Sequence, residues 1–431
     1  MSKLKSYKLS ELYSLNSGIS TSPDQAGHGF PFVSFGTVFN NYFLPENLPD
    51  LMQTSDLERQ QFSVKTGDIF LTRTSENLDE LCMSCVVLKD ITNATYSGFL
   101  KRLRPRQADK TYHKFMGFYL RSEHFRKTIN SNAIMTLRAS FNEQIFSYLN
   151  VLLPEYKAQK SIGNFLYSIQ QKIELNNQIN SKLEALAKLI YDYWFVQFDF
   201  PDGNGKPYKS SGGKMVYNEA LKREIPDGWS NTKLEHIITR SATGLNPRDN
   251  FILGEGQNYY ITIKSIKDGK IVFDDRCDRV SDNSLEIIDK RSDLRVGDVL
   301  FTSIQPVGVT YLILEKPTNW NINESVFSIR ANYEKVTSEF LYMMLSSTEI
   351  KLFTRQSSSG SIHKGIRHSV LKDFNLPYGG KDITESFSKL VSPILSKSFI
   401  LDKENQQLEQ LRDWLLPLLM NGQVTVSEPG N

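Results

Sequence analysis

The chain has 431 residues, of which 39% are hydrophobic and 23% are charged, and its formal net charge is +3. This composition fits a globular protein of two or three domains, and no apolar run approaches the ~20 residues that cross a membrane. The N-terminus lacks the apolar stretch of a signal peptide, and three cysteines cannot form a disulfide framework. We therefore expect a cytoplasmic protein without a membrane partner.

Residues 1–154 are expected to form a first globular domain of short strands and turns with one or two helices. The segments 30–35 and 68–72 are typical of strands bounded by glycine and proline. Ten lysine and arginine residues lie between positions 100 and 138, against only Asp109 and Glu123. Such a segment suits contacts with phosphates, and a solvated surface is the plainer alternative.

Residues 155–198 are expected to form a first long helix. Apolar residues recur there at alternating spacings of four and three, which is the pattern of a coiled-coil seam. Pro154 marks a natural boundary before the helix. The central seam positions are Ile169, Ile173, Asn176, Asn180 and Leu183.

The second half of the chain repeats this organisation after a linker. Proline, glycine and serine are too dense at 199–227 for a regular element. The expected elements that follow are a second globular domain at 228–378, a second long helix at 379–421 and a C-terminal tail at 422–431.

The second long helix shows the same four-three spacing, with Leu401, Glu404 and Leu408 near its middle. Pro393 and Pro417 predict a kink or break near each of them. Lys397 and Glu404 are polar seam positions, as Asn176 and Asn180 are in the first helix. Antiparallel pairing would bring these polar positions together and fix the register. Two separate amphipathic helices, each packed on its own domain, are the alternative.

Three pairs of segments show that the chain contains a repeat. Gly67-Asp68 lies in one strand-like segment, and Gly297-Asp298 lies in a similar segment 230 residues later. Two further pairs, at the start of and within the long helices, are offset by 223 and 225 residues. A near-constant offset indicates a duplicated unit. The expected fold is α+β, with two similar α/β globular domains separated by two long antiparallel helices and related by an approximate twofold axis.

Motifs for catalysis and metal binding are missing from the sequence. There is no Walker A motif, no G-x-G-x-x-G after an expected strand and no H-E-x-x-H. Cys82 and Cys85 form a C-x-x-C pair, but Cys277 lies in the other half of the chain and no histidine has ligand spacing. A binding or scaffold protein is therefore favoured over an enzyme, and no metal site is expected.

The segment 186–201, continued by 205–215 and 225–229, resembles the central region of specificity subunits of type I restriction-modification systems. The repeated Gly-Asp segment and the paired helices resemble the same family. The resemblance implies two target recognition domains, each reading one half of a bipartite double-stranded DNA sequence. The helices would act as a ruler and dock two methyltransferase subunits.

The same resemblance implies that cofactors belong to the partners. The methyltransferase subunits would bind S-adenosylmethionine, and restriction subunits, where the system has them, would use ATP and magnesium. This chain would hold no cofactor and would catalyse nothing. A non-catalytic two-domain scaffold that binds proteins is the alternative.

Arginine, lysine, glutamine, serine and histidine side chains are the expected DNA contacts, because they donate hydrogen bonds to bases and phosphates. In the first domain these are Arg73, Arg102, Arg104, Arg121, Arg126, Lys127 and Arg138. In the second they are Arg248, Lys264, Arg355, Gln356, Ser359, His363, Lys364, Arg367 and His368.

Overall fold

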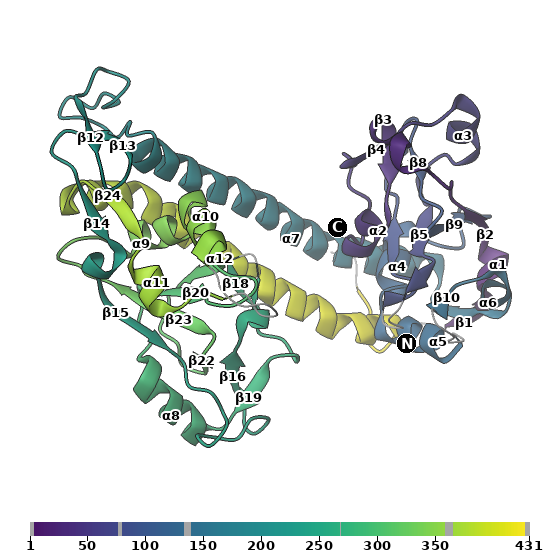
Figure 1. Cartoon of the computed structure of the whole chain (residues 1–431). Helices are drawn as coiled ribbons and strands as arrows, with labels where there is room; N and C mark the ends of the chain where they lie inside the picture. The colour runs from purple at the N-terminus through teal and green to yellow at the C-terminus, as the bar shows by residue number, and fades with distance from the viewer. Residues whose placement is uncertain (1–3, 76–79, 133–138, 268, 358–364, 427–431) are drawn as a thin grey trace, which may run out of the picture. The chain divides into compact units, whose positions relative to one another are not determined.

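The computed structural model describes residues 4–75, 80–132, 139–267, 269–357 and 365–426 (Figure 1). The chain forms two compact units. Unit 1 comprises residues 1–176 and 404–431, and unit 2 comprises residues 177–403. Each unit therefore combines a globular part with a section of both long helices, and the residue bounds expected for the individual domains stay predictions.

Unit 1 is built on a four-stranded antiparallel sheet in the order β2-β9-β5-β7. A three-stranded sheet, β4-β3-β8, and two strand pairs complete it. The sheet strands are β2 (Tyr13–Ser17), β9 (Leu100–Pro105), β5 (Ile69–Thr72), β7 (Ser84–Val86), β4 (Asp50–Met52), β3 (Ala26–Val33) and β8 (Thr95–Tyr96). The pairs are β1 (Lys5–Lys8) with β11 (Asn150–Leu153), and β6 (Thr74–Ser75) with β10 (Ala139–Ser140).

Unit 2 repeats this topology. Its four-stranded antiparallel sheet has the order β15-β23-β20-β21, and its three-stranded sheet has the order β19-β16-β22. These strands are β15 (Ile238–Thr243), β23 (Val326–Ala331), β20 (Val299–Thr302), β21 (Thr310–Leu312), β19 (Asp278–Val280), β16 (Asn258–Ile261) and β22 (Trp320–Ile322). The pair β14 (Ser230–Lys233) and β24 (Asn375–Tyr378) corresponds to β1 and β11, whereas the pairs β12 (Met215–Asn218) with β13 (Arg223–Pro226) and β17 (Ile266–Lys267) with β18 (Lys270–Ile271) are additions.

Short helices cover the sheets of both units. In unit 1 they are α1 (Leu9–Leu12), α2 (Phe35–Asn40), α3 (Asp56–Gln61), α4 (His113–Tyr119), α5 (Glu123–Asn132) and α6 (Glu143–Tyr148). In unit 2 they are α8 (Asp282–Ser292), α9 (Ser338–Leu345), α10 (Thr348–Ser357) and α11 (His368–Lys372). Single 3-10 turns lie at Pro23–Gln25, Leu234–Ile237 and Ile263–Ser265.

The Gly-Asp segments form the central strands of the two main sheets. All four residues of β5 are buried, with Ile69 and Leu71 in one apolar cluster and Phe70 in another. Successive side chains of a strand point to opposite faces, so β5 is covered on both sides. The strand β20 has the same arrangement in unit 2. Gly67 and Gly297 precede these strands with φ of 85° and 92°, a conformation that favours glycine.

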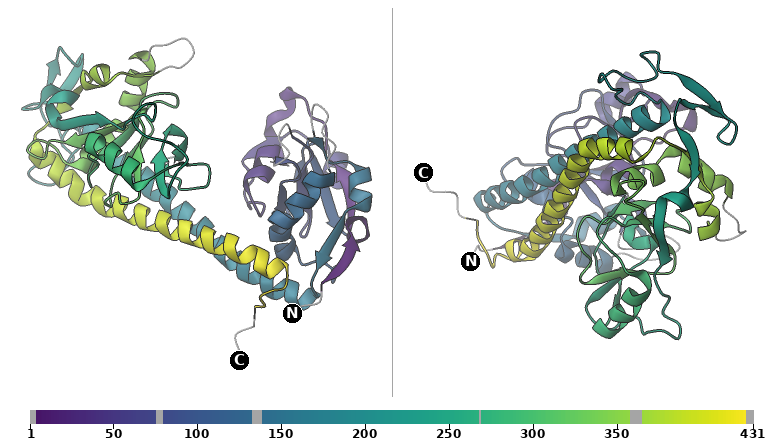
Figure 2. Two further views of the ribbon diagram at one scale, coloured as in Figure 1. Left: turned by 90° about the horizontal axis from the view of Figure 1, so that it is seen from below. Right: turned by 90° about the vertical axis from the view of Figure 1, so that its left-hand side faces the viewer.

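The two long helices are α7 (Tyr156–Tyr191), which ends in a π-helical turn at Asp192–Val196, and α12 (Lys381–Met420) (Figure 2). The seam expected for α7 is correct, since Ile169, Ile173, Asn176 and Asn180 are all buried. Leu183 is half-buried. The expectation near Pro393 and Pro417 was a kink or a break, and no break occurs, because α12 continues through both prolines, which face solvent. A kink at either proline stays a prediction.

The expected seam of α12 is correct at alternate positions and one residue out at the others. Leu401 is buried, but Lys397 is exposed, and Glu404 and Leu408 are only half-buried. Asn405 and Arg412 are buried instead. The apolar spacing pointed to the wrong residue at these positions because the true seam contains polar side chains that are satisfied by partners on α7.

The helices pair antiparallel within each unit. In unit 1, Asn176 Nδ2 donates to Glu404 Oε2 at 2.8 Å and to Asn405 Oδ1 at 2.9 Å. Nearer the start of α7, Gln170 Oε1 accepts from Arg412 Nη1 at 2.9 Å. In unit 2, Asn180 Nδ2 donates to Asp402 Oδ1 at 2.6 Å, rather than meeting Lys397. The expected fold class is confirmed, and two unpaired amphipathic helices are ruled out.

Within the described ranges, none of the helices has the length and apolar composition that crossing a bilayer requires. Cys82 and Cys85 are buried thiols, and burial raises the pKa of Cys85 to about 12. Among the same residues, no group of three or more His, Cys, Asp or Glu side chains is arranged to hold a metal ion.

Candidate nucleic-acid interface

Much of the basic segment at 100–138 holds unit 1 together instead of forming a charged surface. Arg102 is buried, its Nη1 donates to Ser63 O at 2.8 Å, and burial lowers its pKa. Arg104 Nε and Nη2 lie 2.7 and 2.6 Å from the two carboxylate oxygens of the buried Asp68. The expectation that Arg102 and Arg104 contact DNA is therefore corrected, since both guanidinium groups are engaged inside the domain.

Arg121 also has an internal role. Its Nη2 donates to three backbone carbonyls around the C-terminal end of α2, of Val38, Phe39 and Asn41, at 2.8 to 3.0 Å. Its Nε donates to Ser84 O at 2.8 Å, and burial lowers its pKa. These carbonyls have no other donor in the helix, so Arg121 is a structural cap. The expected DNA contact is corrected here too.

The other basic candidates of this segment have mixed positions. Arg126 Nη1 donates to Leu81 O, which fixes at least part of its guanidinium group inside the domain. Lys127 is exposed on α5 and forms an ion pair with Glu123 at 2.6 Å. Arg138 lies outside the described residues. DNA contact by Arg126 and Lys127 stays a prediction.

Arg73 is exposed directly after β5, where two segments meet. Its backbone N–H donates to Phe99 O, and its carbonyl accepts from Phe141 N–H, both at 2.9 Å. In unit 2, Ser303 follows β20 in the same way and accepts from Ile366 N–H at 2.8 Å. The two units therefore join the end of the central strand to the start of a short helix, α6 or α11, by the same contact.

A shallow open pocket lies beside this junction in unit 1, between the end of β5, the start of β9 and α6. It is lined by Arg73, Lys101, Phe141, Asn142, Glu143 and Gln144. Lys101 Nζ donates to Ser17 Oγ at 2.7 Å, and burial followed by the charge of Arg73 lowers its pKa. Two cations with hydrogen-bonding side chains around them suit a polyanion or a base edge.

Sequence reasoning missed Lys101, Asn142 and Gln144 as members of this group. Asn142 caps α6, its Oδ1 accepting from Ile145 N–H at 2.9 Å. Arg367 occupies the corresponding cap position before α11. The repeat was the signal in the sequence that could have found them. The segments 141–148 and 366–372 each come shortly before the closing strand of their unit, β11 or β24.

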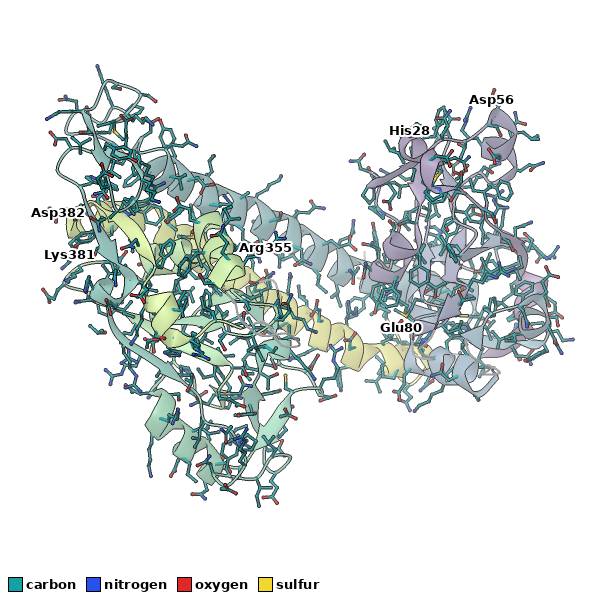
Figure 3. All side chains as sticks on the ribbon, in the orientation of Figure 1. His28, Asp56, Glu80, Arg355, Lys381 and Asp382 are labelled. Atoms are coloured by element: carbon teal, nitrogen blue, oxygen red, sulfur yellow. The ribbon has the colours of Figure 1, made fainter. Side chains whose placement is uncertain are left out.

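The equivalent region of unit 2 displays several of its expected contacts. Arg355 and Gln356 are exposed near the end of α10, where Figure 3 labels Arg355, and Arg367 is exposed before α11. Arg248 is exposed on a loop, and Lys264 is exposed in the 3-10 turn Ile263–Ser265. For these five side chains DNA contact stays a prediction. Ser359, His363 and Lys364 lie outside the described residues.

His368 turns into unit 2. Its Nδ1 lies 3.0 Å from Ser241 Oγ, and its ring packs 3.6 Å from the ring centroid of Phe327. Burial, followed by the charge of Lys372, lowers its pKa to about 4. A neutral, packed imidazole positions the start of α11 and is not placed to reach DNA, so this expected contact is corrected.

Comparisons with known proteins point to one family. Residues 1–185 match the family model described as type I restriction modification DNA specificity domain. The chain is 23% identical over 446 residues to the type I restriction enzyme HindI specificity subunit of Haemophilus influenzae, covering 91% of this chain and 94% of that protein. It is 22% identical over 314 residues to the type I restriction enzyme MjaIX specificity subunit of Methanocaldococcus jannaschii, covering 71% of this chain and 67% of that protein.

A solved structure has the same fold. The crystal structure of the type I restriction-modification S subunit from M. genitalium matches with a TM-score of 0.60 at 14% identity, over 97% of this chain and 96% of that chain. The likeness therefore extends over both units and both long helices, and the resemblance drawn from the sequence is confirmed.

Proposed function

Since the chain belongs to the specificity subunits of type I restriction-modification systems, we propose that each of its units reads one half of a bipartite double-stranded DNA target. The observation that carries this proposal is the duplication of the globular part, with the same strand order in both main sheets. Two similar readers in one chain suit two half-sites at a fixed separation.

The junction after the central strand is the proposed reading surface of each unit. In unit 1 it would use Arg73 with Asn142 and Gln144, and in unit 2 it would use Arg367. Arginine and the side-chain amides can make paired hydrogen bonds to base edges, whereas lysine more often contacts phosphates. The two units have different side chains at equivalent positions of this junction: Arg73 corresponds to Ser303, and Asn142 corresponds to Arg367. This difference fits two half-sites of different sequence.

We further infer that the chain itself is not catalytic. Two methyltransferase subunits would bind S-adenosylmethionine and transfer the methyl group to adenine, and restriction subunits, where present, would use ATP and magnesium. The proposed location is the cytoplasm, because the target is the DNA of the cell. The helices would act as a ruler for the target and carry the partners.

A map of adenine methylation in the source genome, with and without this chain, tests the proposal. The expected result is the loss of one bipartite methylated motif. If the map does not change, DNA selection with the chain and its methyltransferase partner decides between this function and a protein-binding scaffold. Selection of no DNA sequence would favour the scaffold and contradict the proposal.

A further inference from the structure

Unit 2 contains a pocket where its globular part meets the long helices. The pocket has a volume of about 280 Å³ and lies between β21, α9 and sections of α7 and α12. All the residues that line it belong to unit 2. Pockets for drug-sized ligands have volumes of roughly 300 to 1,000 Å³, so this pocket is large enough for one small molecule.

The two units can be aligned residue by residue around this pocket. Ser122 and Ser347 each accept, through Oγ, a hydrogen bond from the backbone N–H three residues later, at 3.4 and 3.3 Å. They are 225 residues apart, which is also the offset within the long helices. In the sheets, Val86 pairs with the first residue of β5 as Leu312 pairs with the first residue of β20. Residues of the two units around the pocket can therefore be matched.

The ring of Tyr42 fills the corresponding place in unit 1. Arg121 Cζ and Arg412 Cζ lie 4.6 and 5.0 Å from its ring centroid, a distance at which a guanidinium group is attracted to the ring. The ring of Phe118 lies 5.4 Å away, centroid to centroid. The backbone of Tyr42 is held beside β7, since its carbonyl accepts from Val86 N–H at 3.0 Å. A strand and two helices, with Arg412 from α12, thus surround one aromatic side chain.

The counterparts of all four neighbours of Tyr42 line the pocket of unit 2. They are Leu312 for Val86, Met343 for Phe118, Ser346 for Arg121 and Ala187 for Arg412. Small side chains thus replace both arginines, and this opens the space. The segment after the 3-10 turn Ile263–Ser265 corresponds to the segment after α2, and it reaches the pocket with Gly269 and Lys270. The pocket of unit 2 is therefore the place at which unit 1 has an aromatic ring.

A hydrogen-bond acceptor is available on the wall of the pocket. Ser346 Oγ donates to Tyr342 O at 2.7 Å, and it lies 2.7 Å from Thr310 Oγ1. Because the proton of Ser346 is already used, Thr310 donates to Ser346 and keeps its own oxygen lone pairs as acceptors. In the part of the chain that the structure describes, no donor to Thr310 Oγ1 is found. An O–H or N–H group on a bound ring would suit this oxygen.

The charged groups around the pocket balance each other. Among the described residues that line it are three carboxylates and three lysines. Lys270 Nζ lies 2.7 Å from Asp402 Oδ1, and Lys188 pairs with Asp192. The remaining carboxylate and lysine have exposed side chains of opposite charge. Since the lining carries no excess charge of either sign, an uncharged ligand is favoured.

We propose that this pocket of unit 2 binds a small, uncharged aromatic molecule that carries a hydrogen-bond donor, such as a phenol. The ring would take the place that Tyr42 has in unit 1, and its donor would face Thr310 Oγ1. The proposal goes beyond the proposed function, because the pocket is separate from the junction that would read DNA. Both long helices line the pocket, so a bound molecule would stabilise the attachment of the globular part of unit 2 to them.

The test uses p-cresol, which has the structure of a tyrosine side chain, and the full chain. Isothermal titration calorimetry should show saturable binding of one p-cresol per chain. Ser346→Arg installs the residue that unit 1 has at this position and should abolish binding. Thr348→Arg is the matched control, since it adds the same charge two residues away at an exposed position, and it should bind as the wild type does.

Thr310→Val is a second variant, which keeps the shape of the side chain and removes the acceptor. It should weaken binding by about two- to tenfold, the effect of one hydrogen bond. Thermal unfolding shows that each variant is folded, and p-cresol should raise the melting temperature of the wild type and of Thr348→Arg. If Ser346→Arg does not fold, Thr310→Val decides.

Three results would overturn the proposal. The first is the absence of saturable binding to the wild-type chain. The second is binding that neither Ser346→Arg nor Thr310→Val weakens, because p-cresol would then lie elsewhere. The third is tighter binding of tyramine or of 4-hydroxyphenylacetate than of p-cresol, because the pocket would then select a charged ligand.

Discussion

Arg104 and Asp68 form a two-pronged ion pair inside unit 1, and Arg330 and Asp298 form the same pair inside unit 2. The Nε–Oδ1 distance is 2.7 Å in both, and the Nη2–Oδ2 distances are 2.6 and 2.8 Å. In each unit the aspartate follows the glycine of the Gly-Asp motif and is fully buried. The most recognisable motif of the sequence is thus an internal clamp between neighbouring strands.

Breaking one clamp should destabilise its unit. Arg104→Met leaves the buried carboxylate of Asp68 without its cation, and removal of one partner from a buried pair costs about 3 kcal/mol. The measurement is the free energy of unfolding in urea. Lys127→Met is the control, because Lys127 pairs with Glu123 on the surface and its replacement should change the free energy of unfolding very little. Equal effects of the two changes would show that the clamp contributes little.

His368 should make the stability of unit 2 depend on pH. The pKa of His368 is about 4 in the folded chain, against a usual value of 6.5. Between pH 6.5 and pH 4 the unfolded chain therefore binds a proton that the folded chain does not, so stability is present above this range and is lost as the pH falls through it. Protonation would also bury a second N–H, since Nε2 is enclosed without a hydrogen-bond partner.

The measurement is the urea midpoint of the wild type and of His368→Gln at pH 7.5 and pH 5. Carboxylates titrate in both proteins and lower both urea midpoints. The contribution of His368 is therefore the difference between the fall in midpoint of the wild type and that of His368→Gln. We expect a smaller decrease for His368→Gln, because it has no imidazole to protonate. Equal decreases would mean that His368 titrates alike in the folded and unfolded chain.

Periodic and repeated features were predictable from the sequence, and features that depend on distant partners were not. The seam of α7 followed from spacing because apolar residues on both sides of Asn176 and Asn180 keep the same four-three pattern. Alternate positions of the α12 seam were misplaced by one residue because Asn405 and Arg412 are buried through their contacts with Asn176 and Gln170 on the other helix. A polar side chain at a seam position cannot be recognised before its partner is known.

The same reasoning explains the candidate DNA contacts. Ten cations in one segment indicated a basic surface. A guanidinium group that donates to carbonyls or a carboxylate inside the domain does not contribute to that surface. Arg102, Arg104 and Arg121 each find such acceptors far away in the sequence. Arg73 and Arg367 stay candidates because the repeat places both beside the same junction, at its strand end and at its helix cap.

Removing the buried amides of the seam should raise stability. Asn176 Oδ1 is buried without a hydrogen-bond partner, and polar residues in a coiled-coil seam cost stability while they fix register. Asn176→Leu with Asn405→Leu should therefore increase the free energy of unfolding by about 1 kcal/mol or more. Asn176→Leu alone should increase the free energy of unfolding by less, because Asn405 Oδ1 then loses the hydrogen bond from Asn176 Nδ2. A decrease in the double variant would contradict this reading of the seam.

Arg367→Ala should weaken the reading of one half-site and leave assembly with the methyltransferase intact. A paired hydrogen bond to a base is worth about 1 to 3 kcal/mol of discrimination, so the preference at one base pair should fall by about tenfold or more. The measurement is binding of the assembled complex to DNA in which each half-site is varied in turn. Lys316→Ala, an exposed lysine of unit 2 outside the predicted contacts, should change neither half-site. Loss of assembly with unchanged DNA preference would contradict the role of Arg367.

Insertion of seven residues tests whether the helices measure the target. One heptad keeps the seam in phase and lengthens a helix by about 10 Å. The heptad is inserted after Leu183 in α7 and at the matching level of α12. This double insertion should preserve folding, because the contact of Asn176 with Asn405 is untouched. It should change or abolish the tolerated spacer between half-sites. Inserted in α7 alone, it removes the match between the helices and should lower the melting temperature. DNA selection gives the spacer in each case, and an unchanged spacer in the matched variant would mean that the helices do not set the distance between the half-sites.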